Sequence, residues 1–195
     1  EKLERILRES ARLSIKYGIR SLSMDDICRE LGISKKTLYQ YVDSKPDLIS
    51  RILQYNYDEH TKSVKASIDA DHNAIDILLV VSRKVCLDMQ NFNPSTTFDL
   101  QKYYPEIFKT HYEAKLKAVF NDIKANLNRG IAEGIYRDDM DVDLVARLYV
   151  QKLEVVHNPD FLENMAKDTA SFARVFHVMF DNHIRGICNA TGLAY

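Results

Sequence analysis

Residues 30–48, "ELGISKKTLYQYVDSKPDL", decide the fold of the N-terminal part of the chain. Gly32 suits a tight turn, and Ser34 has the position of an N-cap before a short helix. Leu38 and Val42 follow at four-residue spacing, so we expect both to face a core. The open side of this helix then carries four polar side chains: Lys35, Lys36, Tyr39 and Gln40.

The segment before it completes a helix-turn-helix pattern. Ser23, with Asp26 three residues later, predicts a capped helix whose Ile27 and Leu31 point inward. The second helix of such a unit enters the major groove of DNA, where lysines and hydroxyls meet base edges and phosphates. The spacing alone leaves an alternative open, namely a helical sensor or interaction protein whose helix-turn-helix no longer binds DNA.

Helical spacing of apolar residues continues along almost the whole chain, and alternating strand patterns are missing. We therefore predict an all-α protein. An N-terminal three-helix helix-turn-helix DNA-binding domain, residues 1–46, joins a larger helical domain, residues 47–195.

Composition narrows the function further. Net charge is −1 over 195 residues, yet residues 1–51 hold 11 Lys and Arg against 8 Asp and Glu, which makes the N-terminal part basic. Three widely spaced cysteines without a CxxC pair indicate neither a disulfide framework nor a zinc site. The sequence shows no membrane span or signal peptide, so we expect a cytoplasmic protein.

Residues 6–53 resemble the N-terminal domain of the TetR family of bacterial transcriptional repressors. The resemblance rests on the start of the first helix, on Gly18 after it, on "SMDDICRELGIS", and on a set of motif positions. These positions are Gly32, Ile33, Ser34, Thr37, Leu38, Tyr39, Tyr41, Val42, Lys45 and Leu48. Ser14 and Val42 depart from it, because the family commonly has large aromatic residues there.

The resemblance implies a set of DNA contacts. Tyr39 and Lys45 would bind phosphates, and Ser23 would cap its helix and touch a phosphate. The residues in or beside the groove would be Lys35, Lys36, Thr37, Gln40 and Tyr41. Free N–H groups at the helix start place Ser34 beside a phosphate as well.

The resemblance also implies that residues 47–195 form a ligand-sensing and dimerisation domain. The homodimer would bind a palindromic double-stranded DNA operator and release it when a small apolar or amphipathic ligand binds. The ligand-binding candidates are Met89, Phe98, Phe108, His111, Tyr112 and Tyr149. The dimer candidates, in the last two helices, are Leu148, Leu153, Phe172, Phe176, Met179 and Phe180. Ordinary core packing within one chain is the alternative for both sets.

Catalysis has no support in the sequence. Glu154 and His157, and Asp69 and His72, have the spacing of carboxylate–histidine pairs in di-iron helical bundles. Such a site also needs a buried glutamate from each of two further helices, and none recurs. We therefore predict a protein that is not an enzyme and has no metal or cofactor.

Overall fold

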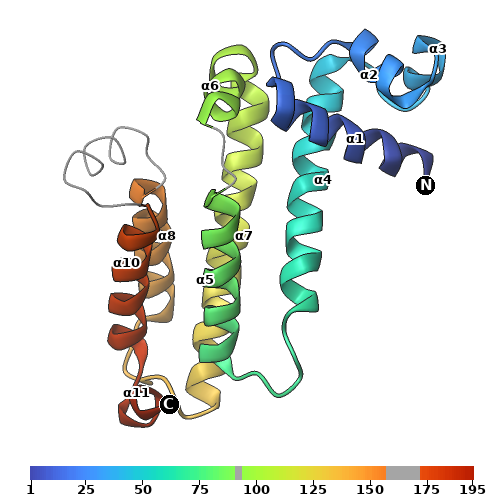
Figure 1. Cartoon of the computed structure of the whole chain (residues 1–195). Helices are drawn as coiled ribbons and strands as arrows, with labels where there is room; N and C mark the ends of the chain where they lie inside the picture. Colours follow the sequence, from blue (N-terminus) through green and yellow to red (C-terminus); the bar gives the residue numbers. More distant parts are fainter. Residues whose placement is uncertain (91–93, 157–171) are drawn as a thin grey trace. The chain divides into compact units, whose positions relative to one another are not determined.

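The computed structural model describes residues 1–90, 94–156 and 172–195, and it confirms the all-α prediction (Figure 1). The helices are α1 (Lys2–Tyr17), α2 (Met24–Leu31), α3 (Lys35–Leu38), α4 (Lys45–Ala66), α5 (Ala74–Gln90), α6 (Pro94–Tyr103), α7 (Pro105–Ala132), α8 (Val142–Val156), α10 (Phe172–Ile187) and α11 (Ala190–Ala194). Among the described helices, none is long and apolar enough to cross a membrane.

The chain divides into two compact units. Unit 1 comprises Glu1–Lys65 and Phe92–Ala114, and unit 2 comprises Ala66–Asn91 and Lys115–Tyr195. The boundary predicted at residue 46 falls at the start of α4, whereas unit 1 continues beyond it. The reason is a second small core in unit 1, in which Ile49 of α4 packs with Ile19 and with Leu100 of α6.

The sequence signals for helix ends in unit 1 have a clear structural basis. The Ser23 side chain accepts a hydrogen bond from the Asp26 amide, and the Asp26 carboxylate accepts one from the Ser23 amide, both at 3.1 Å. This is the predicted capping box. Gly32 ends α2 with φ of 64°, in the left-handed region that favours glycine. Ser34 then caps α3 by accepting from the Thr37 amide at 3.1 Å.

The helix-turn-helix has its own apolar core. Leu38 and Val42 are almost completely buried, as predicted. Their neighbours in this core are Ile6, Ala11, Leu13, Leu22, Ile27, Cys28, Leu31, Leu48 and Ile52. Residues 35–42, which we call the recognition segment, are thereby fixed to α1, α2 and α4.

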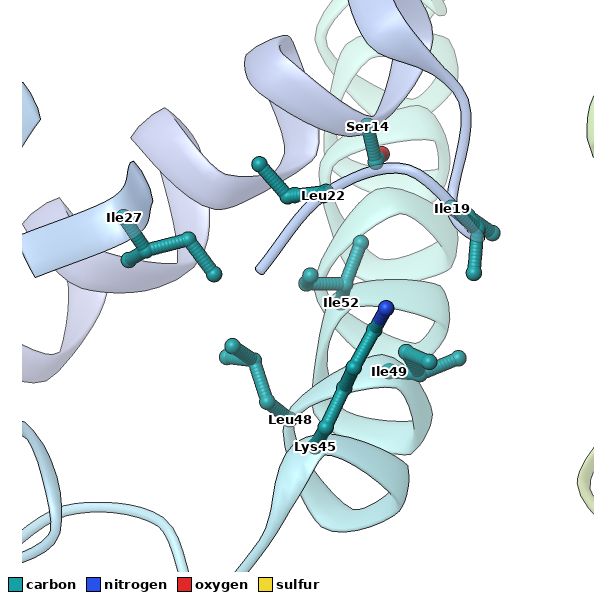
Figure 2. A pocket seen from close by; sticks show the side chains of 8 residues that line it. All are labelled: Ser14, Ile19, Leu22, Ile27, Lys45, Leu48, Ile49 and Ile52. Atoms are coloured by element: carbon teal, nitrogen blue, oxygen red, sulfur yellow. The ribbon is translucent and has the colours of Figure 1, made fainter. Parts of the chain in front are cut away.

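Ser14 is buried beside this core, where the family commonly has an aromatic residue. Its hydroxyl donates to the Ala11 carbonyl at 2.8 Å, which satisfies it within its own helix. The space beside it is only about 10 Å³, so neighbouring side chains fill most of the room that a larger ring would occupy. Figure 2 shows the lining residues: Ser14, Ile19, Leu22, Ile27, Lys45, Leu48, Ile49 and Ile52.

In unit 2 a buried polar network joins α5, α7 and the segment after α7. The Tyr136 hydroxyl donates to Asn126 Oδ1 at 3.2 Å, and Asn126 Nδ2 donates to the Ala74 carbonyl at 2.8 Å. A β-carbon on Gly130 would lie 2.0 Å from the Tyr136 ring, so glycine is required where the ring packs.

Candidate nucleic-acid interface

The recognition segment is a short helix that continues as a turn. Regular α-helix covers Lys35–Leu38, and the Tyr41 amide then donates to the Leu38 carbonyl at 3.0 Å. With Leu38 buried beneath it, the side chains of Lys36, Tyr39 and Gln40 are exposed. We define these three residues as the recognition face. In Figure 1 this segment and α2 lie near the N-terminal end of α4.

The two adjacent lysines of the recognition segment differ in their partners. Lys35 Nζ lies 2.8 Å from Asp25 Oδ1 at the start of α2, and this hydrogen bond raises the pKa of the lysine. Lys36 has no ion-pair partner among the described residues. Lys36 is therefore the lysine whose charge is available to a phosphate or a base without breaking an existing pair.

Most predicted hydroxyl groups already have local hydrogen bonds. Ser34 Oγ and Thr37 Oγ1 are 2.9 Å apart, and the Ser23 hydroxyl donates to Asp26 Oδ2 at 2.5 Å. Tyr39 is 47% exposed, whereas Tyr41 is half-buried against the core. Of these groups, Tyr39 is the one whose position best suits contact with a large partner.

Lys45 occupies a different position from the recognition face. Its Nζ donates to the Arg20 carbonyl at 3.0 Å, and Figure 2 shows the side chain running from α4 toward the segment that carries Ile19 and Leu22. Burial lowers the pKa of Lys45, and the negative charge of Asp99 partly offsets that effect. One of the three ammonium donors is therefore engaged before any phosphate arrives.

Sequence reasoning missed two acidic residues here. Asp25 pairs with Lys35, and Asp99 of α6 accepts a hydrogen bond from the Arg20 amide at 3.3 Å. The helical pattern signals neither contact, since each joins side chains or backbone of separate elements.

The six ligand-binding candidates are divided between the two units. In unit 1, Phe108 stacks on Tyr112 with ring centroids 5.5 Å apart, and His111 Nε2 lies 3.0 Å from Ser50 Oγ. Burial lowers the pKa of His111, while Phe98 is 57% exposed.

Met89 and Tyr149 belong to unit 2. The buried Tyr149 ring packs against the ring of His183, with ring centroids 4.3 Å apart. The side chain of Met89 is not part of the described structure. None of the six residues lines the small space beside Ser14. A ligand site made of these residues stays a prediction.

The dimer candidates also separate into groups. Phe176, Met179 and Phe180 are buried in the core of unit 2, and Leu153 packs against that core. Their role in an interface stays a prediction, because an amphipathic helix can bury the same apolar face against its own chain or against a partner. Leu148 is 53% exposed and stays available to a partner, and the side chain of Phe172 lies outside the description.

The described residues contain no group of three His, Cys, Asp or Glu side chains that could hold a metal ion. His72 Nδ1 instead accepts a hydrogen bond from the Asp69 amide at 3.0 Å, which orders the chain between α4 and α5. His157 lies outside the described residues.

A buried three-helix core that presents an exposed, partly cationic helix after a glycine turn defines a helix-turn-helix DNA-binding protein. Comparison with known proteins agrees. Residues 6–52 match the model of the bacterial regulatory proteins of the tetR family. Residues 6–52 therefore carry the DNA-binding domain of the TetR family, and the chain is a DNA-binding transcriptional regulator.

Individual proteins are similar to most of the chain. The HTH-type transcriptional regulator YvaF of Bacillus subtilis (strain 168) is 26% identical over 161 residues, which cover 81% of this chain and 82% of the relative. A TetR-family regulator from Agrobacterium tumefaciens has the same fold, with a TM-score of 0.65, 19% identity, and coverage of 96% and 98%. A putative transcriptional regulator from Saccharomonospora viridis, solved in complex with choline, matches with a TM-score of 0.72 and 19% identity. The match covers 97% of this chain and 98% of that protein.

Proposed function

We propose that this regulator is a homodimeric repressor that binds a palindromic operator through the recognition face and leaves it when a small apolar or amphipathic ligand binds. The observation that carries the proposal is Lys36, an exposed cation without an ion-pair partner among the described residues, beside Tyr39 on a helix fixed by Leu38. Such a helix supplies both phosphate contacts and base contacts.

The dimer is supported by an exposed apolar stripe in unit 2. Leu144 and Leu148 are one helical turn apart on α8, and both are about half exposed, as is Val178 of α10. Exposed leucines at this spacing suit packing against a second copy of the helix. A dimer would also present two recognition faces to adjacent turns of the major groove, about 34–36 Å apart.

Release by a ligand is supported by the likeness to the choline-bound Saccharomonospora viridis protein and by the aromatic side chains of α7, where Phe108 and Tyr112 stack. Aromatic walls with a few polar groups suit such a ligand. These rings support a ligand of the small apolar or amphipathic class.

The DNA-binding part of the proposal is tested by a gel-shift titration at fixed salt. The probe is a duplex that the wild-type protein selects from a random pool. Lys36→Ala should weaken binding and lower the salt dependence, because one phosphate or base contact is lost.

Lys65→Ala is the matched control. It removes one exposed lysine about 30 Å along α4 from Lys45, at a rise of about 1.5 Å per residue. Equal affinity of the Lys36 and Lys65 variants would refute the role of the recognition face.

A further inference from the structure

Arg20 differs from the other arginines of the basic N-terminal segment. The guanidinium groups of the others all bond to an oxygen within unit 1, in the pairs Arg5 with the Leu31 carbonyl, Arg8 with Glu9, Arg12 with Glu9 and Glu30, Arg29 with Asp26, and Arg51 with Asp47. For Arg20, no carboxylate lies within ion-pair distance in the part of the chain that the structure describes. Its guanidinium instead lies over the ring of Tyr103, 4.9 Å from the centroid.

Helix α6 holds both the backbone and the side chain of Arg20. The Arg20 amide donates to Asp99 Oδ2 at 3.3 Å, while the Tyr103 ring supports the guanidinium. Stacking on a ring uses the flat face of a guanidinium and leaves its N–H groups, which lie in the plane, free to donate. Because Arg20 is exposed, these donors are accessible to solvent and to a bound partner.

The position of Arg20 relates it to the proposed DNA contacts. Its carbonyl accepts from Lys45 Nζ at 3.0 Å, and Ser23 follows three residues later, at most about 11 Å of extended chain. Figure 1 shows the segment between α1 and α2 near the beginning of α4. Arg20 therefore lies close to two residues expected to contact phosphates.

We propose that Arg20 is a further contact to the DNA phosphate backbone and that Tyr103 and Asp99 of α6 are its positioning residues. The inference rests on the proposed DNA-binding function and adds α6 to the elements that determine affinity. A guanidinium prealigned on a ring loses less freedom when it binds a phosphate than a mobile side chain does. Lys102, whose Nζ lies 5.5 Å from the centroid of the same ring, places a second positive charge nearby.

The first experiment measures the salt dependence of binding to the selected duplex, and of binding to a random-sequence duplex of the same length. Arg20→Gln keeps a polar side chain and removes the charge. The slope of log K against log salt should fall by about 0.9 for each bound subunit, on both duplexes, since a phosphate contact carries no sequence information. Lys65→Gln removes one charge from the same unit and should leave the slope unchanged.

The second experiment tests the positioning role of Tyr103. Tyr103→Ala should weaken binding less than Arg20→Gln does, and Tyr103→Phe should restore wild-type affinity because the ring face is kept. In the double variant, Arg20→Gln with Tyr103→Ala, affinity should equal that of Arg20→Gln alone, since the ring acts only through the arginine. A role confined to folding would instead give additive losses.

Thermal unfolding of each variant separates failure of folding from failure of binding. The inference is overturned if Arg20→Gln unfolds at the wild-type temperature and keeps the wild-type slope. It is also overturned if Arg20→Gln changes only the unfolding temperature, because Arg20 is then a structural residue. If the wild-type protein shows no salt-dependent DNA binding, or if Lys36→Ala leaves DNA affinity unchanged, the proposed function itself is contradicted.

Discussion

At the scale of single residues, Gly130 shows how a missing side chain determines packing. Gly130→Ala would place a β-carbon 2.0 Å from the buried Tyr136 ring, whose hydroxyl is held by Asn126. We expect a loss of about 1–3 kcal/mol in the free energy of unfolding, typical of overpacked cores. Urea denaturation followed by circular dichroism measures it.

Gly186→Ala is the matched control for this substitution. Gly186 is a helical glycine with nothing within 4 Å of its β-position. The alanine should raise the free energy of unfolding by up to about 1 kcal/mol, because glycine is a poor helix former. Similar losses in both variants would contradict the account of Tyr136.

His183 gives a prediction about pH. The ring is buried against Tyr149, its Nε2 has no hydrogen-bond partner in the described structure, and burial lowers its pKa from 6.5 to about 4, with a smaller effect from Lys152. Between these two values the unfolded chain binds more protons than the folded chain. Stability is therefore fully present above pH 6.5 and falls as the pH approaches 4, by up to about 3 kcal/mol.

Denaturation of the wild type and of His183→Phe at several pH values tests this prediction. The phenylalanine keeps a ring against Tyr149 and cannot be protonated, so its stability should depend less on pH between 6.5 and 4. Identical pH profiles for the two proteins would show that His183 does not titrate in this way.

At the scale of elements, we expect the ion pair between α2 and the recognition segment to lower the affinity for DNA. Asp25 binds Lys35 at 2.8 Å and adds a negative charge where DNA is expected. Asp25→Asn should tighten binding to the selected duplex, because Lys35 is released and a repulsion is removed. A gel-shift titration measures the change.

Glu113→Gln is the control for the change in net charge, since Glu113 is an exposed carboxylate on α7 in the same unit. It should bind DNA as the wild type does. Unchanged or weaker binding by Asp25→Asn would mean that the ion pair orients the recognition segment rather than restraining it.

The helix ends and ion pairs of unit 1 show which features could be predicted from the sequence. The caps at Ser23 and Ser34 and the turn at Gly32 are local, because each hydrogen bond joins residues close in the chain. The pairs Lys35–Asp25 and Lys45–Arg20 depend on how separate elements pack, and helical periodicity carries no such information. The helices and turn of the helix-turn-helix were therefore predictable, while the partners of their cations were not.

At the scale of the whole molecule, the same limit applies to the dimer. The pattern of α10 predicts a buried apolar face but not whether the same chain or a partner covers it. In the structure Phe176, Met179 and Phe180 face the core of unit 2. Leu148, the exposed dimer candidate, could be distinguished from the buried ones only once this packing was known.

Leu148→Glu tests the dimer directly. Burying a carboxylate in an apolar interface is costly, so the variant should sediment as a monomer at concentrations where the wild type is a dimer. Leu193→Glu changes a leucine of α11 with similar exposure, 54% against 53%, and should leave the assembly intact. Sedimentation of Leu148→Glu as a dimer would place the interface elsewhere.

Selection of bound duplexes from a random pool, with wild-type protein and with Lys36→Ala in parallel, tests the central claim most directly. For the wild type we predict enriched sequences with two half-sites related by two-fold symmetry, with centres one helical turn of about 10–10.5 base pairs, or a multiple of it, apart. The Lys36→Ala variant should enrich them weakly. No enrichment by the wild type, or equal enrichment by both proteins, would contradict DNA reading through the recognition face.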